Sequence, residues 1–183
     1  MLKVTVLTGF ILSGIYASGQ RITPYTGPFP VPPANKSMLF YLQRTMNKNT
    51  VVYEANYDAG GKINKEQPVK IHWVDFEDGG KISPLNFLQN KFAYGVELIG
   101  SAGADAVFKI HLVSYKKIVI TLMPSGRNGS YQALVPIRGR ESVLTSVLID
   151  IVGGTYLKPE VYYIELSGKD VQTGEKVVEQ IRP

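Results

Sequence analysis

Two histidines, His72 and His111, are the side chains best suited to acid–base or metal chemistry in this sequence. Each is predicted to lie within a strand beside a lysine two residues away, Lys70 for His72 and Lys109 for His111. Nearby lysines repel a divalent cation and disfavour imidazolium. The spacings His-x-His and His-Glu-x-x-His are also absent. We therefore expect no metal site, and we expect both histidines to lie on the surface or in a hydrogen-bond network.

Carboxylates are the second group that could do chemistry, because a pair of them catalyses glycoside hydrolysis without leaving a local sequence signature. Glu54, Glu97 and Glu165 lie in predicted strands, so one or two could face a cavity. The simpler interpretation is that the alternation of each strand points these glutamates outward into solvent. No Gly-x-Ser-x-Gly motif indicates serine catalysis. No catalytic residue is assigned, and a protein without catalytic activity is the preferred interpretation.

Composition excludes further classes of site. The chain has no cysteine, which rules out thiol nucleophiles, thiolate metal ligands and disulfides. Paired glycines within residues 58–63 and 77–82 lack the spacing of a phosphate-binding loop and are interpreted as turns. No cofactor is expected. The net charge of +5 comes from scattered lysines and arginines without a basic run, so nucleic acid is not an expected partner.

Three residues are candidates for ligand binding: Arg44, Tyr94 and Trp73. Arg44 ends the first predicted strand, where its side chain could anchor a polar group at one mouth of the fold. Tyr94 follows the predicted helix, and Trp73 could form a platform for a ligand. The competing interpretations are a surface ion pair for Arg44 and a core position for Trp73, which shares a strand face with Val69 and Ile71.

Short β-like runs position these residues. β-Branched and aromatic residues dominate the runs, and Gly, Asn, Asp, Ser and Pro separate them. Alternation is clear where Phe108 and Ile110 share one face and Lys109 and His111 share the other. The predicted strands are Met38–Arg44, Thr50–Tyr57, Val69–Phe76, Tyr94–Ile99, Ala106–Val113, Lys117–Met123, Tyr131–Arg138, Ser142–Val152, Val161–Gly168 and Lys176–Ile181.

One short helix is predicted near residues 84–91. Ser83 is its expected cap, Pro84 suits the first helical position, and Leu85, Leu88 and Phe92 have the spacing to dock on the sheet. Since no segment suits a βαβ crossover, we expect an antiparallel sheet.

The expected fold is all-β, a single antiparallel meander of nine or ten strands that closes into a barrel and so removes its exposed edges. A two-sheet β-sandwich is the alternative. Bulky apolar side chains are expected to fill the interior, with any ligand at one mouth. The inward candidates are Trp73, Phe108, Ile110, Leu112, Ile118, Ile120 and Leu122.

The N-terminal segment predicts export. Lys3, a short apolar run and the small residues Ala17, Ser18 and Gly19 are typical of a signal peptide over residues 1–19, with the mature chain starting at Gln20. The apolar run is shorter than a membrane span, so no transmembrane segment is expected after cleavage. Residues 20–36 carry five prolines and predict an extended arm that either engages a partner or lies against the domain. Residues 37–183 are expected to form a single β domain.

The chain resembles a family of small exported proteins, common in Bacteroidetes, that is known only as a domain of unknown function. The resemblance implies a periplasmic or cell-surface location in a bacterium and brings no catalytic residue with it. The segments that carry it are Phe40 to Arg44, Asn47-Lys48-Asn49, Tyr53, Pro68-Val69, Trp73, Ala93-Tyr94-Gly95, Tyr163 to Asp170 and Thr173-Gly174.

Three functions remain open from these observations. The first is an envelope or periplasmic β domain that binds a ligand or an envelope protein without catalysis. The second is a hydrolase acting on envelope or extracellular polysaccharide, and the third is a structural component of the envelope. A cavity lined by Tyr, Trp and one or two charged groups would favour the binding of a small molecule, whereas two carboxylates in one cleft would favour glycoside hydrolysis.

Overall fold

The fold is known from a computed structural model, which describes residues 21–102, 106–126, 129–155 and 158–183. The predicted signal peptide lies outside the described residues. Within them, no helix is both long enough and apolar enough to cross a lipid bilayer.

Eleven strands make up most of the described chain, which confirms the all-β prediction. Alternation explains them locally: in the sixth strand Phe108 and Ile110 are buried whereas Lys109 is exposed. The strands are β1 (Met38–Arg44), β2 (Asn47–Ala55), β3 (Val69–Asp75), β4 (Lys81–Pro84), β5 (Val96–Ala102), β6 (Val107–Leu112), β7 (Tyr115–Pro124), β8 (Tyr131–Ile137), β9 (Arg140–Thr155), β10 (Lys158–Asp170) and β11 (Lys176–Ile181).

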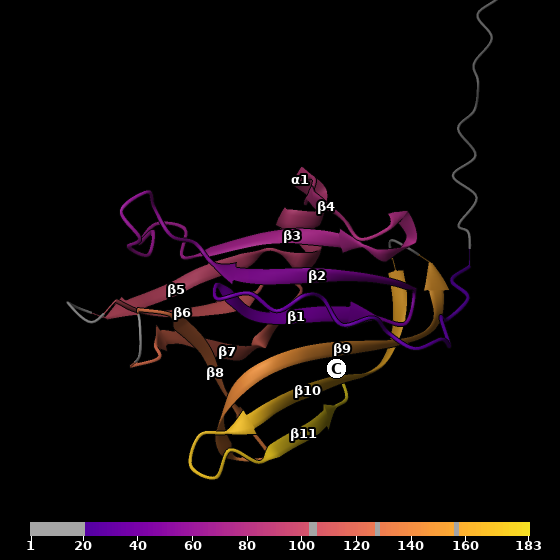
Figure 1. Cartoon of the computed structure of the whole chain (residues 1–183). Coiled ribbons are helices and arrows are strands. Elements are labelled where there is room, and N and C mark those ends of the chain that lie inside the picture. Colours follow the sequence, from indigo (N-terminus) through magenta and orange to yellow (C-terminus); the bar gives the residue numbers. More distant parts are fainter. Residues whose placement is uncertain (1–20, 103–105, 127–128, 156–157) are drawn as a thin grey trace, which may run out of the picture.

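The strands form one sheet that curls into a half-barrel (Figure 1). Its order is β4-β3-β2-β1-β9-β8-β7-β6-β5, and β10 and β11 branch from β9. The predictions of a closed barrel and of a two-sheet sandwich are both wrong. Closure would require β4 to pair with β5, and the described residues of these two edge strands do not pair.

The sequence predicted a purely antiparallel sheet, and this prediction is wrong because of β9. One edge of this 16-residue strand pairs with β10. On the other edge, residues 140–143 pair with β8 and residues 146–149 pair with β1. The β1–β9 pairing is parallel, in the register Arg44 to Ile149. The long connection that a parallel pair requires is supplied here by the entire chain between the two strands.

The helical segment begins later than predicted. Residues Lys81–Pro84 form β4, an edge strand, which is a position where proline is tolerated. Asn86 caps the short helix α1 (Phe87–Gln89) in a capping box with Gln89, so Ser83 is not the cap. The π-helix η2 (Asn90–Tyr94) follows directly, and a 3₁₀ turn, η1 (Phe76–Asp78), lies between β3 and β4.

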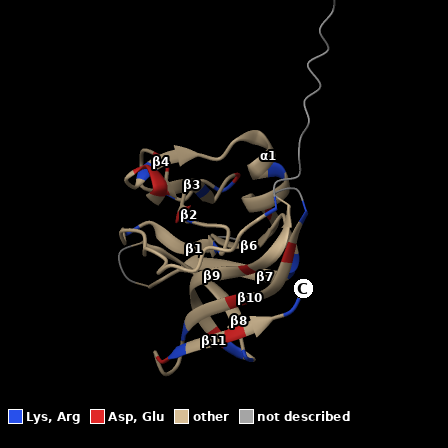
Figure 2. Ribbon diagram, turned by 90° about the vertical axis from the view of Figure 1, so that its right-hand side faces the viewer, with Lys and Arg blue, Asp and Glu red and all other residues tan. Residues whose placement is uncertain are grey.

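Charged side chains are distributed over the fold in both signs. Figure 2 shows basic and acidic segments mixed along β10 and β11 and around β4, without a stripe of one sign in that view.

The proline-rich arm lies against the outer face of the half-barrel. Ile22 is buried, and its N–H donates to the carbonyl of Gly154 at 3.1 Å. The side-chain amide of Gln43, on the outer face of β1, donates to the carbonyl of Pro30 at 2.8 Å and to the Thr50 hydroxyl at 3.2 Å. The described part of the arm therefore packs as part of the domain.

Candidate functional site

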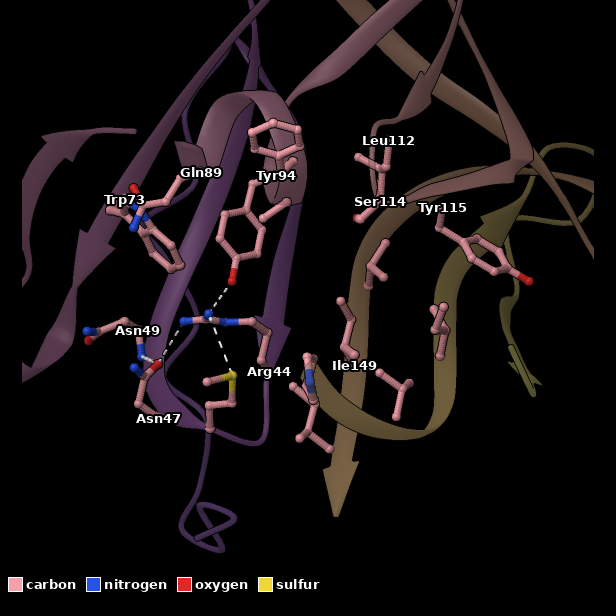
Figure 3. A pocket seen from close by; sticks show the side chains of 18 of the residues that line it. Arg44, Asn47, Asn49, Trp73, Gln89, Tyr94, Leu112, Ser114, Tyr115 and Ile149 are labelled. Atoms are coloured by element: carbon pink, nitrogen blue, oxygen red, sulfur yellow. Dashed lines mark hydrogen bonds between the residues drawn. The ribbon is translucent and has the colours of Figure 1, made fainter. Parts of the chain in front are cut away.

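A cavity of about 1010 Å³ occupies one end of the half-barrel interior. The end of β1, the start of β2, the end of β3 and the helical segment α1–η2 form one wall. Residues of β6, β7, β9 and β10 form the opposite wall (Figure 3). The cavity is at the upper end of the range of about 300–1,000 Å³ that is typical of small-molecule sites.

The expectation that bulky side chains fill the interior holds at one end of the half-barrel and is wrong at the other, and the predicted inward residues divide into two groups. Phe108, Ile110 and Leu122 are buried in the filled part of the core, where Phe40 stacks on Tyr53 with ring centroids 4.4 Å apart. The remaining four line the cavity: Trp73, Leu112, Ile118 and Ile120.

Arg44 is the centre of the polar wall. Its side chain is 8% exposed, and its guanidinium contacts three neutral acceptors. Nη1 donates to the Tyr94 hydroxyl and lies 3.9 Å from the Met46 sulfur, and Nη2 donates to Asn47 Oδ1 at 3.3 Å. No carboxylate oxygen of a described residue lies within 4.0 Å of this guanidinium. The predicted alternative of a surface ion pair is wrong on both points.

The structure brings all three sequence-predicted ligand-binding residues together. The Arg44 guanidinium carbon lies 4.8 Å from the centre of the Trp73 ring and 5.0 Å from that of Tyr94. The Trp73 and Tyr94 rings meet edge to face, with centroids 5.1 Å apart. Two aromatic faces and one cation thus form a single cluster.

The helical segment holds this cluster in place. The Trp73 indole N–H donates to Gln89 Oε1 at 3.2 Å, and the same oxygen accepts the Asn86 N–H of the capping box. The π-helix η2 then turns Tyr94 toward Arg44. Gly95 ends this segment, and a Cβ at Gly95 would lie 1.9 Å from the carbonyl oxygen of Asn90, so only glycine fits there.

Tyr53 supports Tyr94 from the filled part of the core. Its hydroxyl donates to the carbonyl oxygen of Tyr94 at 2.8 Å. Burial raises the pKa of the Tyr53 phenol well above its ordinary value, so the phenol remains protonated and keeps its donor. The backbone of Tyr94 is fixed by Tyr53 while its hydroxyl accepts from Arg44.

The opposite wall is apolar. β7 contributes Ile118 and Ile120, and β9 contributes Ile149 and Ile151. Figure 3 shows Leu112 across the cavity from the Arg44–Tyr94 pair, and Ile149 lies beside Arg44 as its partner on β9. The site therefore combines one polar end with an apolar body.

The rim of the cavity carries exposed apolar side chains. Leu88 and Phe92 line the cavity mouth and are 64% and 62% exposed, and Phe87 beside them is 72% exposed. Docking of Leu88 and Phe92 on the sheet, as the spacing had predicted, is therefore wrong. The reason is that α1 begins at Phe87, and this short segment presents these residues to the mouth.

Both histidines lie away from the cavity, and each faces a glutamate. His111 Nε2 lies 2.8 Å from Glu97, which also accepts from Lys116. His72 Nδ1 lies 3.7 Å from Glu54, too far for a hydrogen bond, and burial lowers the His72 pKa below its ordinary value. Both side chains are buried rather than on the surface. Within the described ranges, no three His, Asp or Glu side chains gather as metal ligands would.

The three candidate carboxylates do not form a pair in the cavity. Glu54 faces His72, Glu97 binds His111 and Lys116, and Glu165 accepts from Gln180 at 2.9 Å. Of the described residues that line the cavity, Asp75 alone is acidic. Its Oδ1 already accepts the N–H groups of Glu77 and Asp78.

Sequence reasoning missed the residues that make the site a cavity. Met46, Asn47 and Gln89 were not candidates from the sequence, yet all three line the cavity. The Asn-Lys-Asn run over residues 47–49 could have indicated a polar cluster next to Arg44. Nothing local in β9 or β10 distinguishes apolar residues that line a cavity from those that fill a core.

Comparison with known proteins gives one match. A protein-family model described as Domain of unknown function (DUF4833) matches residues 40–180. Neither the curated proteins nor the solved structures give a match.

Proposed function

Because the chain belongs to the DUF4833 family, a domain of unknown function, we propose its function from the site: it binds a small molecule with an apolar body in the half-barrel cavity, without catalysis. The observation that carries this proposal is a cavity of about 1010 Å³ with apolar residues on one wall and a few convergent polar groups on the other. Sites for small ligands have this composition.

The rim supports ligand binding as well. Leu88 and Phe92 extend the apolar surface from the cavity to solvent at the mouth. Such a surface gives an apolar ligand a continuous path into the site. It also accounts for large exposed side chains that contribute little to packing.

The polysaccharide hydrolase is supported less well. Glycoside hydrolysis by the usual mechanism needs two carboxylates that flank one bond. The described lining of the cavity offers only Asp75, which is engaged with backbone N–H groups. A purely structural envelope component would have no use for a cavity of this size.

In this proposal the protein acts in the periplasm or at the cell surface of a bacterium. Its support is the signal-peptide pattern of residues 1–19. Intact mass of protein exported by the native host tests it: a chain starting at Gln20 is expected, and retention of Met1 would contradict export.

Binding can be tested with a neutral apolar fluorophore, N-phenyl-1-naphthylamine, whose emission rises in an apolar site. Two neighbouring residues of β7 give a matched pair of variants. Ile118 lines the cavity, whereas Val119 points to the other face and is exposed. We expect Ile118→Trp to weaken binding of the fluorophore because the indole enters the cavity and narrows it, and Val119→Trp to retain the wild-type response.

Two results would contradict the proposal. One is a wild-type protein that gives no saturable increase in emission. The other is an equal response from the two tryptophan variants, which would place the probe outside the cavity.

A further inference from the structure

Arg44 carries a charge for which the described residues supply no counterion within 4.0 Å. The side chain is 8% exposed, and the oxygens and sulfur around its guanidinium belong to a phenol, an amide and a thioether. Buried charges in proteins are ordinarily paired with an opposite charge, because removing a lone ion from water is costly. An arginine held in this state at the wall of a cavity is suited to an anion that arrives with a ligand.

The donors of Arg44 are incompletely used. Nε is shielded from solvent and has no acceptor among the described residues, and Nη2 has one acceptor for its two N–H groups. One N–H from each terminal nitrogen, Nη1 and Nη2, can bind the two oxygens of a carboxylate end-on. Met46 offers Nη1 only a weak sulfur acceptor on a flexible side chain, which a carboxylate oxygen can displace.

The immediate surroundings of Arg44 favour a ligand with a single negative charge. Arg44 is the only basic residue of the described lining, and the acidic residue Asp75 forms no ion pair with it and accepts backbone N–H groups instead. A phosphate monoester carries close to two charges near neutral pH and would leave one of them without a partner. A carboxylate balances Arg44 alone.

The two walls then define the rest of the ligand. On the wall opposite the Arg44–Tyr94–Trp73 cluster, the lining consists largely of Leu, Ile and Val side chains of β6, β7, β9 and β10. A molecule that satisfies both walls has a carboxylate at one end and an apolar chain or ring system at the other.

We propose that the ligand is an apolar carboxylic acid of the fatty-acid type, bound as its anion with the carboxylate on Arg44. This inference rests on the proposed function, since it assigns the head group of a ligand held in the same cavity.

Displacement of bound N-phenyl-1-naphthylamine by dodecanoate and by 1-dodecanol at neutral pH tests the head group. The two compounds have the same chain length and differ in the charged end. We expect dodecanoate to displace the probe at a concentration about tenfold or more below that of 1-dodecanol, as for other charge-assisted hydrogen bonds. Arg44→Met should remove this advantage and preserve displacement by 1-dodecanol. Arg140→Met, which removes the same charge from an exposed site, should leave the advantage intact.

The outcomes separate the two proposals. If the probe binds and 1-dodecanol displaces it as well as dodecanoate does, or if neither displaces it, the carboxylate inference is overturned and cavity binding stands. If the probe itself does not bind, the proposed function fails. The wild-type ratio decides the inference even if Arg44→Met does not fold.

Discussion

The two ends of the half-barrel interior are built from the same strands and similar residues, yet one end is filled and the other is hollow. In β6, Phe108 is 1% exposed and packs in the filled core, whereas Leu112 lines the cavity. In β1, Phe40 stacks on Tyr53 at the filled end, and Arg44 borders the cavity. The difference shows that this fold obtains its stability from one end of its strands and leaves the other end available for a ligand.

The largest expected effect is a difference between truncations at the two ends. Phe108→Ala should lower the free energy of unfolding by about 3–5 kcal/mol, because it leaves a void in a packed core. Ile118→Ala should cost about 1 kcal/mol or less, because its side chain is half-buried at a space that is already empty. Urea unfolding of the two variants measures both values. Equal losses would mean that the two ends are packed alike.

Enlargement of side chains should give the opposite contrast. Ala133 is fully buried at the filled end, so Ala133→Leu should cost about 1–3 kcal/mol through overpacking. Ile149→Phe extends into the cavity and should change the unfolding free energy by less than about 1 kcal/mol. Thermal and urea denaturation are the measurements. A larger penalty for Ile149→Phe than for Ala133→Leu would contradict a hollow end.

Two adjacent residues of β1 differ in how far their buried polar groups are hydrogen-bonded. Gln43 and Arg44 are equally buried, at 8% exposure each, but the arm and Thr50 satisfy the Gln43 amide whereas Arg44 has unused donors. Gln43→Ala should cost about 1–2 kcal/mol, because the Pro30 carbonyl loses its donor. Arg44→Met should remain within about 1 kcal/mol of the wild type, because it removes an unpaired buried charge. A strongly destabilised Arg44→Met would show that Arg44 is structural.

The smallest expected effect concerns pH and lies outside both ends of the interior. Burial lowers the His72 pKa below its ordinary value of 6.5. The charge of Glu54 opposes this shift, and the charge of Lys70 adds to it. Below pH 6.5 the unfolded chain therefore takes up a proton that folded His72 does not, so stability falls as pH falls. The slope is at most about 1.4 kcal/mol per pH unit for one group. His72→Gln should flatten the unfolding free energy between pH 7 and 5; an unchanged slope would assign the effect elsewhere.

Much of the fold could be predicted because it depends on local patterns. Alternation placed Phe108, Ile110 and Trp73 inward, and the structure buries all three. Turn residues placed most strand ends within a few positions. Closure and strand direction could not be predicted, because the parallel β1–β9 pairing joins segments far apart in the sequence and has no local signature.

The candidate site could be predicted in part. Arg44 and Tyr94 were singled out from residue type and position next to the end of an element, and Trp73 was singled out as an aromatic platform within a strand. The contact among these three residues depends on the parallel pairing of β1 with β9 and on η2, and neither follows from the sequence pattern. Packing also determines whether Ile120 fills a core or lines a cavity, and the residue type is the same in both cases.

The parallel pairing of β1 with β9 also determines the order in which parts of the protein fold. Thr45 and Ile151 exchange hydrogen bonds across it, 106 residues apart along the chain. Contacts of such long range form late, because closing a long loop is slow relative to forming a hairpin. Arg44 and Ile149 are partners in this same register, and both line the cavity. The hairpins β2–β3 and β6–β7 can therefore form from their own sequences, whereas the cavity exists only after the first and ninth strands meet. Ligand capture should then appear as the final kinetic phase of refolding, and a newly made chain should gain it only after β9 has been synthesised.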